Sequence, residues 1–379
     1  SLLATRYSRL PTRYSLLARM SPPSIPRVLI QQNMSNLFRD LLKKIGSGQH
    51  TSEHLTRTEA GLATKMMLLG EAKPAQIGAF LIAHRIKRPT SEELAGMLDA
   101  YNELGPRLKA IEGEQPIVFG TPYDGRTRTA PITPITALLL ACCGQNVIMH
   151  GGDRLPTKYG LTLVEIWQGL GIDWTKLELS KTQQVIEKTG IGFVYTPLHF
   201  PVLESMWEYR DQIGKRPPFA SMELIWCPYA GDAHIVTGFV HPPTEERFKA
   251  TLSHMGITKF TTVKGLEGSC DLPRDRTAII GLGDGNNLGR LLLVPREYGF
   301  TTKNVPLNST EELISEMKSV LAGLPSELMQ TALWNGGFYL FRCGICANMS
   351  EGLAKAKELL HCGAVSKKLR QLEQAINSM

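Results

Sequence analysis

The chain has 379 residues, of which 42% are hydrophobic and 20% charged, enough for one large domain and a smaller one. No apolar run reaches the roughly 18 residues that a membrane-spanning helix needs, so an integral membrane protein is not expected. The net charge of +7 would suit nucleic acid, but residues 1–40 supply +5 of it through six arginines and one aspartate. The rest of the chain carries only +2, so a broad basic face is not favoured.

The first segment, residues 1–34, is rich in Arg, Ser and Leu and has no acidic residue. This composition is typical of an organelle transit peptide, although an upstream or artificial extension would also explain it. The seven cysteines are an odd number, and no secretory apolar region precedes them, which favours a reduced intracellular compartment. We expect a cytoplasmic protein, or an organellar one if the segment is a transit peptide.

Residues 35–110 are predicted to form helices. Thr56 with Glu59, and Thr90 with Glu93, are capping boxes that precede apolar residues at helical spacing. Between them, residues 75–88 form an apolar stretch that ends in a basic turn, as the helix dipole prefers. This part of the chain therefore indicates a small all-helical domain.

From residue 116 onward, short apolar runs alternate with helical stretches: PIVFG, NVIMHGG, GFVYT, HIVTGFV, FTTVKG and TAIIGLG. This alternation predicts an α/β domain with a mostly parallel sheet. The glycine-rich residues 281–290 lack the Lys-Ser/Thr ending of a Walker loop and are interpreted as a connection between strands. We expect the helical domain at 35–110, the α/β domain at 111–379, and a cleft between them.

The stretch VFGTPYDGRTRTAPITPITALLLA (118–141) has the layout of a strand, a tight loop and a helix start. Its glycines permit close backbone approach to a ligand, and the first N–H groups of a helix attract anions. MHGGDR (149–154) follows the next apolar run, at the same sheet edge, where ligands of open α/β sheets bind. An ordinary strand-to-helix turn and a structural His150 are the alternatives.

Seven segments in order, between about residues 35 and 375, resemble the anthranilate phosphoribosyltransferase family. GTPYDG (120–125) is similar to the family's G-T-G-G-D-G, MHGGDR (149–154) to K-H-G-N-R, and KGLEGSCDL (264–272) to its G-x-D-G-x-D-E metal motif. The other four similar segments are residues 55–97, 192–201, 208–219 and 334–340. The resemblance implies the family's two-domain fold, with residues 175–205 contributing to the helical domain.

The resemblance also implies the site. Phosphoribosyl pyrophosphate would be bound by Gly120, Thr121, Asp124, Gly125, Thr129 and Thr133. His150 and Gly151 would approach the acceptor, and Arg210 would grip an acceptor carboxylate with its guanidinium fork. Asp271, with Glu267 nearby, would hold Mg²⁺ on the pyrophosphate, since magnesium takes carboxylate and phosphate oxygens. A homodimer through the helical domain is implied as well, using helix faces that include Leu37, Leu41 and Ile45.

Several residues depart from the family's pattern. The replacements are Pro122, Tyr123, Pro131, Pro134, Met149, Gly152, Asp153 and Cys270. Each lost charge-assisted contact costs about 1.5–3 kcal/mol. The candidate cations for compensation beside the loop are Arg126, Arg128 and Arg154. The sequence therefore indicates a divergent paralogue and not the tryptophan-pathway enzyme itself.

The resemblance and these departures leave three alternative functions. The favoured one is transfer of a phosphoribosyl or related pentosyl group to an unidentified acceptor, anthranilate-type by resemblance, with no catalytic residue assigned. The second is a non-catalytic binder of nucleic acid or of a metabolite, with a basic patch at Lys43, Lys44, Arg85, Lys87 and Arg88. The third is a silent fold kept for protein association.

Two further motifs are given less weight. His50 and His54 lie in an H-x-x-E-H pattern found in one class of metalloprotease, but no third ligand is evident. Cys343 and Cys346 form a lone C-x-x-C, which we interpret as small core residues and not as a zinc site.

Overall fold

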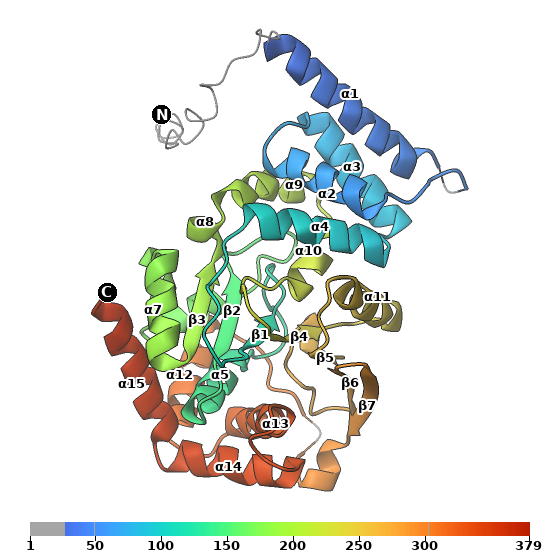
Figure 1. Ribbon diagram of the computed structural model, residues 1–379. Coiled ribbons are helices and arrows are strands. Elements are labelled where there is room, and N and C mark those ends of the chain that lie inside the picture. Colours follow the sequence, from blue (N-terminus) through green and yellow to red (C-terminus); the bar gives the residue numbers. More distant parts are fainter. Residues whose placement is uncertain (1–26, 49, 302) are drawn as a thin grey trace.

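The computed structural model describes residues 27–48, 50–301 and 303–379. A small helical domain lies against one side of a larger α/β domain, which confirms the predicted architecture (Figure 1). The first helix, α1 (Arg27–Gly46), begins inside the segment that we assigned to the tail, and residues 1–26 lie outside the described part. In the described part, none of the helices combines the length and apolar character needed to cross a membrane.

Three further helices follow α1: α2 (Arg57–Leu68), α3 (Pro74–Lys87) and α4 (Ser91–Leu104). Both predicted capping boxes are confirmed. The Thr56 hydroxyl accepts the N–H of Glu59 at 3.2 Å, and the Glu59 carboxylate accepts the N–H of Thr56 at 3.0 Å. Thr90 and Glu93 make the same exchange at the start of α4. These bonds satisfy backbone donors that a helix start leaves free, so α2 and α4 begin at these residues.

The predicted dimer face is wrong at two of its three positions. Leu41 and Ile45 are only 4% and 2% exposed, because they pack in the core of the helical domain. Leu37, with 40% exposure, remains at the surface. The homodimer therefore stays a prediction, and these three side chains do not form its face.

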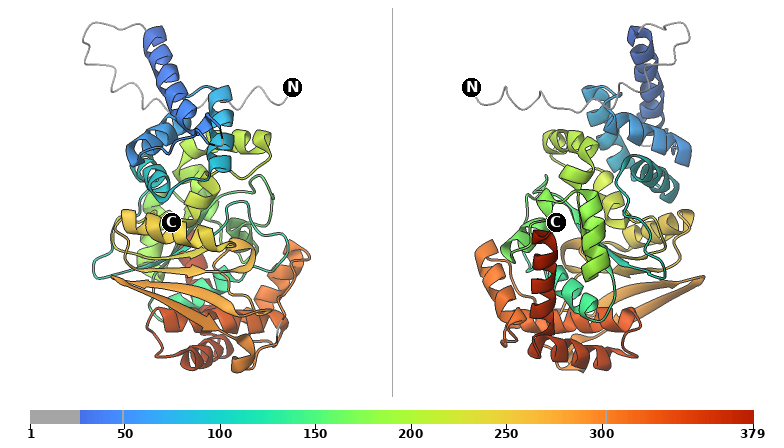
Figure 2. Two further views of the ribbon diagram at one scale, coloured as in Figure 1. Left: turned by 90° about the vertical axis from the view of Figure 1, so that its right-hand side faces the viewer. Right: turned by 60° about the vertical axis from the view of Figure 1, so that its left-hand side comes forward.

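The α/β domain contains one sheet in the order β3-β2-β1-β4-β5-β6-β7. The strands are β1 (Ile117–Gly120), β2 (Val147–Gly151), β3 (Ile191–Tyr195), β4 (His234–Gly238), β5 (Phe260–Val263), β6 (Ala278–Asp284) and β7 (Asn287–Leu293). Strands β1 to β5 run parallel, and β6 and β7 are antiparallel. The interpretation of residues 281–290 as a connection is wrong for most of that range, because only Gly285 and Asn286 separate β6 from β7. Figure 2 shows this hairpin at one end of the sheet.

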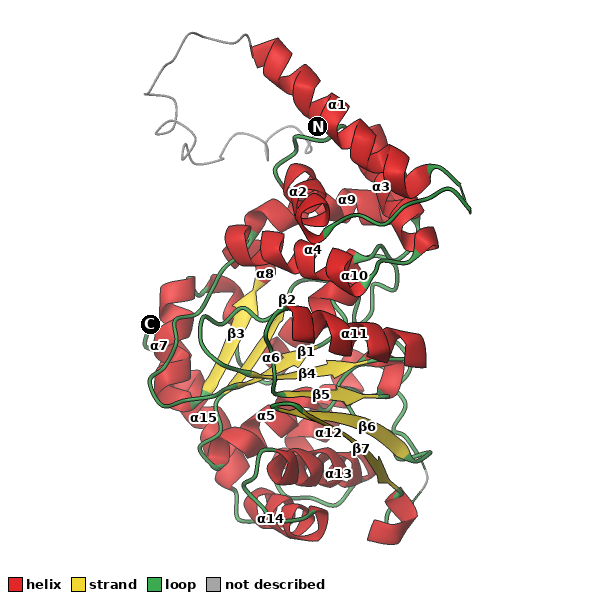
Figure 3. Ribbon diagram, turned by 45° about the vertical axis from the view of Figure 1, so that its right-hand side comes forward, coloured by secondary structure: helices red, strands yellow, loops and turns green. Residues whose placement is uncertain are grey.

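Helices cover both faces of the sheet (Figure 3). Neighbouring strand residues point to opposite faces, so Phe119 joins one hydrophobic core and Val118 the other. The helices on the Phe119 side are α5 (Thr133–Cys142), α6 (Leu163–Gly169), α12 (Thr310–Leu321), α13 (Glu327–Arg342), α14 (Met349–His361) and α15 (Ala364–Asn377). On the Val118 side lie α11 (Pro242–His254) and the helical domain.

A later segment returns to the helical domain, and it differs from the predicted 175–205. Helix α7 (Leu179–Thr189) packs on β3 and α15. Residues 196–226 carry α8 (Thr196–His199), α9 (Ser205–Ile213) and α10 (Phe219–Met222). The rings of Phe200 and Trp226 lie edge-on to Tyr101 of α4, with centroids 5.1 and 5.6 Å away. This aromatic cluster ties α4 to residues 196–226, and the Trp226 ring also lies edge-on to His150 at the carboxyl end of β2, with centroids 5.2 Å apart.

Candidate functional site

The β1–α5 loop, residues 121–132, holds much of the predicted phosphate site, but its flanking and internal glycines serve the chain's own packing. A Cβ at Gly120 would lie 1.9 Å from the carbonyl oxygen of Leu224, and one at Gly125 would lie 2.3 Å from that of Gly160. Gly125 also has φ +74°, which other residues rarely adopt. These glycines therefore let two backbone segments of the chain pack closely against each other. This role differs from the predicted one, which was close approach of the loop backbone to a ligand.

The predicted site residues face two different spaces. A cavity of about 20 Å³ is lined by Thr121, Gly125, Thr133 and Asp271. That volume holds about one water molecule, which is smaller than a pyrophosphate in this arrangement of the loop. Asp124 lines a much larger cleft instead, where its carboxylate oxygen lies 2.6 Å from Arg216. The structure thus does not gather the predicted residues around one ligand-sized space.

Asp271, one of the predicted metal ligands, is fully engaged by the chain itself. One carboxylate oxygen accepts the Arg126 guanidinium at 2.8 Å and the backbone N–H of Ile132 at 3.0 Å. The other accepts the Thr133 hydroxyl at 2.9 Å. The Asp271 side chain is 3% exposed. It therefore ties the loop and the start of α5 to the segment after β5.

Glu267, the other predicted metal ligand, accepts three successive backbone N–H groups of the loop. These are Thr127 at 3.2 Å, Arg128 at 3.0 Å and Thr129 at 3.0 Å, and the Thr129 hydroxyl adds a bond of 2.9 Å. Burial raises the pKa of Glu267, but attraction to Arg126 and the backbone N–H bonds outweigh it and lower the pKa to about 2. Glu267 itself adopts φ +54°, a strained conformation for this residue. A carboxylate of the protein therefore occupies the backbone donors that a phosphate would use.

The two carboxylates do not fit a resident magnesium ion. Mg²⁺ needs free carboxylate oxygens in octahedral geometry, whereas Glu267 and Asp271 both bind the Arg126 guanidinium. Cys270 stands at the remaining family position, buried, with its Sγ 3.2 Å from the carbonyl oxygen of Gly120. Within residues 27–48, 50–301 and 303–379, no group of three or more His, Cys, Asp and Glu side chains could hold a metal ion, so the His50–His54 pattern gains no site either. The two predicted metal ligands thus form an internal ion-pair network in this structure, and magnesium binding on a pyrophosphate stays a prediction.

His150 and Gly151 lie at the carboxyl end of β2, as predicted, but the His150 side chain is buried. It is 0% exposed, and its Nδ1 lies 2.6 Å from the hydroxyl of Tyr123. Burial lowers the pKa of His150 to about 3, so the ring is neutral near pH 7. Tyr123, which replaces a family glycine, fills the space between the loop and β2. The structural interpretation of His150 is therefore the better one.

The guanidinium of Arg210 is already paired with a carboxylate of the same chain. Its guanidinium forms an ion pair with Glu223, and both side chains are 2% exposed or less. The hydroxyl of Tyr101 donates to the same carboxylate at 3.1 Å. An acceptor carboxylate would have to compete with Glu223 for this arginine. Both residues border the cleft, so they shape its wall.

The interdomain cleft has a volume of about 790 Å³ and lies at the carboxyl edge of the sheet. Its walls come from the end of α3, the β1–α5 loop, residues 156–158, residues 210–224 and the start of α11. Three of its cations, which we call the arginine cluster, are Arg85, Arg88 and Arg247. Among the described residues, no carboxylate lies within 4.0 Å of any of them. Partial burial lowers the pKa of Arg247, repulsion from Arg88 lowers it further, and a smaller attraction to Glu93 opposes both.

The other cations that the sequence singled out are already paired. Arg154 lies 2.9 Å from Glu165, and Arg128 lies 3.8 Å from Glu267. In the predicted basic patch, the ion pairs are Lys43 with Asp40, Lys44 with Glu59 and Lys87 with Glu93. Only Arg85 and Arg88 of that patch reach the cleft. Sequence reasoning missed Arg247, although its place in the helix after β4 put it near the ligand-binding edge.

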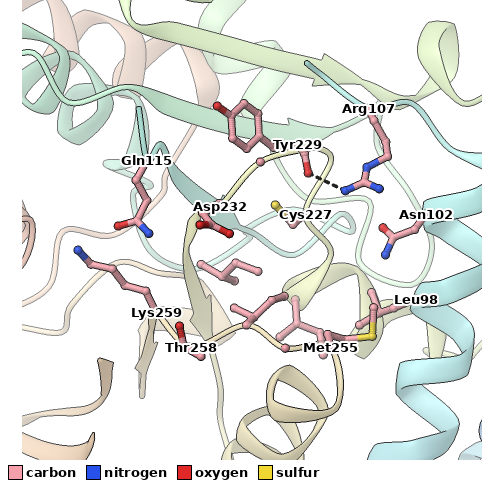
Figure 4. A pocket seen from close by; sticks show the side chains of 16 residues that line it. Leu98, Asn102, Arg107, Gln115, Cys227, Tyr229, Asp232, Met255, Thr258 and Lys259 are labelled. Carbon is pink, nitrogen blue, oxygen red and sulfur yellow. Dashed lines mark hydrogen bonds between the residues drawn. The ribbon is translucent and has the colours of Figure 1, made fainter. Parts of the chain in front are cut away.

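A second cavity of about 260 Å³ lies at the opposite, amino edge of the sheet (Figure 4). Asp232 and Lys259 line it, and the guanidinium of Arg107 donates to the carbonyl oxygen of Tyr229 at 3.0 Å. None of the predicted site residues lines it. The interdomain cleft, which borders Asp124, Arg210 and Glu267, is therefore the candidate ligand site.

The helical domain, the mostly parallel sheet and the cleft between them define a two-domain α/β protein of the glycosyl transferase class. Residues 39–105 match the glycosyl transferase family's helical bundle domain, and residues 118–366 match its a/b domain. The chain therefore belongs to this glycosyl transferase family, which is that of anthranilate phosphoribosyltransferase.

Relatives match along nearly the whole chain. The anthranilate phosphoribosyltransferase of Bradyrhizobium sp. (strain BTAi1) is 26% identical, and the match covers 89% of this chain and 99% of the relative. That of Desulfatibacillum aliphaticivorans is 27% identical, over 89% and 98%.

Solved structures agree on the fold. The Thermus thermophilus anthranilate phosphoribosyltransferase superposes with a TM-score of 0.74 at 22% identity, over 89% of this chain and 99% of that one. The Saccharomyces cerevisiae enzyme in complex with PRPP and Mg gives 0.76 at 18% identity, over 92% and 100%.

Proposed function

We propose that the protein binds a ligand of the phosphoribosyl pyrophosphate type in the interdomain cleft and transfers its pentosyl group to an acceptor other than anthranilate. The observation that carries this proposal is the arginine cluster. Arg88 and Arg247 repel each other, the attraction of Arg247 to Glu93 offsets this only in part, and neither arginine has a carboxylate within 4.0 Å among the described residues. Placing like charges together without a counter-ion is unfavourable unless an anion joins them. The Saccharomyces cerevisiae relative in complex with PRPP and Mg supports a phosphorylated pentose as that anion.

The cluster also suits the chemistry of the family. When a pentosyl group is transferred, pyrophosphate departs and its negative charge must be neutralised. Guanidinium groups bind phosphate oxygens with two parallel hydrogen bonds. The arginines come from both domains, Arg85 and Arg88 from the end of α3 and Arg247 from α11. We therefore expect the phosphates to lie at the helical-domain side of the cleft.

The acceptor is proposed to differ from anthranilate because Arg210 is already neutralised. Its ion pair with Glu223 leaves no uncompensated charge for an aromatic carboxylate. Glu223 also borders the cleft and accepts from Tyr101, so a neutral acceptor with hydrogen-bond donors is the better match.

Calorimetric titration with phosphoribosyl pyrophosphate tests this proposal. Wild type is expected to bind with micromolar affinity, and the double variant Arg88→Ala/Arg247→Ala at least about tenfold more weakly, because charge-assisted bonds contribute about 1.5–3 kcal/mol each. Arg154→Ala is the matched control, since it removes an exposed arginine outside the cleft. No binding by wild type at millimolar ligand, or equal binding by wild type and the double variant, would contradict it.

Nucleic-acid binding is the second candidate, and the exposure of Arg85 and Arg88 favours it. A single-stranded oligonucleotide would then bind more weakly as salt rises, with a slope that decreases in the double variant. Fluorescence anisotropy at two salt concentrations measures this. Absence of binding at low salt would exclude this candidate.

A further inference from the structure

Arg126 is surrounded by acceptors in the place where the family's motif would predict a metal ion. Its side chain is 5% exposed. The guanidinium donates to Asp271 at 2.8 Å, to the Ser269 hydroxyl at 2.8 Å and to Glu267 at 3.3 Å, and it also bonds the hydroxyl of Thr129. One cationic group thus joins both carboxylates and the loop.

The charges of this network balance without a metal. Glu267 and Asp271 bring two negative charges, Arg126 brings one positive charge, and the ammonium group of Lys158 lies 3.4 Å from Glu267. A divalent ion would have to displace the guanidinium and leave it buried without its two carboxylate partners, which is strongly unfavourable.

The same network blocks the backbone N–H groups of the β1–α5 loop from binding phosphate. Because Glu267 accepts the N–H groups of residues 127–129, an incoming phosphate would lose those donors and meet a buried negative charge. The small cavity beside Asp271 leaves room for about one water. A phosphate ligand is therefore directed toward the arginine cluster.

We propose that Arg126 is a built-in cation that replaces a divalent metal between Glu267 and Asp271, so that the protein binds its phosphate ligand without magnesium. The part that concerns the ligand rests on the proposed function. The replacement of the metal by Arg126 does not, because it concerns the protein alone.

The metal part is tested without any ligand by titrating Mn²⁺, read by electron paramagnetic resonance, into three proteins: wild type, Arg126→Ala and Arg126→Ala/Asp271→Asn. We expect no stoichiometric binding by wild type at millimolar Mn²⁺. Arg126→Ala, shown to be folded by circular dichroism, should gain one site, and Asp271→Asn in that background should remove it. The gain would confirm that the guanidinium occupies a metal position.

Two results would overturn the metal proposal. One is a folded Arg126→Ala protein that gains no Mn²⁺ site. The other is wild-type binding of one Mn²⁺ at micromolar concentration that Asp271→Asn abolishes. This second comparison needs no Arg126 variant, so it decides the question even if Arg126→Ala does not fold.

The ligand part is tested by titrating wild type with phosphoribosyl pyrophosphate in EDTA and in Mg²⁺. Affinities within about threefold of each other, less than the tenfold that 1.4 kcal/mol represents, would support metal-independent binding. Binding seen only with Mg²⁺ would refute it. No binding in either buffer would reject the proposed function and leave the Mn²⁺ result standing.

Discussion

The β1–α5 loop and the arginine cluster face the same cleft, but the positive charge in the loop is paired with carboxylates and that in the cluster is not. In the loop, the guanidinium of Arg126 is buried and lies within hydrogen-bond distance of two carboxylates. In the cluster, Arg88 and Arg247 repel each other, this repulsion exceeds the attraction of Arg247 to Glu93, and neither forms an ion pair with a carboxylate in the described part of the chain. Neutralised charges hold a structure together, whereas uncompensated ones are available to a ligand. The difference predicts that loop substitutions change stability and cluster substitutions change binding.

The largest effect is expected from Asp271→Ala. The variant leaves Arg126 buried without its 2.8 Å partner and frees the N–H of Ile132. Breaking a buried pair in this way lowers the free energy of unfolding by about 3–5 kcal/mol. Urea unfolding followed by tryptophan fluorescence measures it. A loss below about 1 kcal/mol would show that the loop does not depend on this network.

Acid sensitivity of the loop comes next. Folding lowers the pKa of Glu267 from 4.5 to about 2, so the folded protein favours the carboxylate form. Its contribution is complete above pH 4.5 and is lost as the pH falls toward 2. Glu267→Gln lacks this dependence, so its stability relative to wild type should improve by up to about 3 kcal/mol over that range. Unfolding curves of both proteins across this pH range test it, and a constant difference would contradict it.

Arg247→Ala should leave stability almost unchanged. The side chain forms no ion pair in the described part, and its removal relieves repulsion from Arg88, which exceeds the lost attraction to Glu93. The free energy of unfolding is expected to stay within about 0.5 kcal/mol of wild type. A destabilisation as large as that of Asp271→Ala would place Arg247 with the structural residues, and the comparison between loop and cluster would fail.

The smallest combined effect on stability and ligand binding is expected from Arg154→Ala. Its ion pair with Glu165 is substantially exposed, with 46% of the Arg154 side chain accessible. Exposed pairs of this kind contribute about 0–1 kcal/mol. Thermal unfolding and ligand titration should both match wild type, which is what qualifies this variant as the control. A clear change in either would require another control arginine.

Local features of this chain could be predicted from the sequence, because neighbouring residues determine them. The capping boxes at Thr56 and Thr90 formed as predicted, and the six apolar runs became strands β1 to β6. Strand β7 was missed because its side chains are mostly exposed, although Asp284-Gly285 was a hairpin signal.

The site was harder to predict because its interactions join distant segments. The motif placed Glu267 and Asp271 together, but only the fold shows that Arg126 fills the space between them. Likewise, the sequence identifies Arg210 as an arginine at a family position, whereas its neutralisation by Glu223 depends on how α9 packs beside residues 219–225.

The most direct test of the account is a crystal structure of the protein with pyrophosphate, grown in EDTA. The account predicts that the anion lies beside Arg88 and Arg247, while Glu267 keeps its bonds to the N–H groups of Arg128 and Thr129. An anion bound to those N–H groups, with Glu267 displaced, would contradict it and return the β1–α5 loop to the role of a phosphate site.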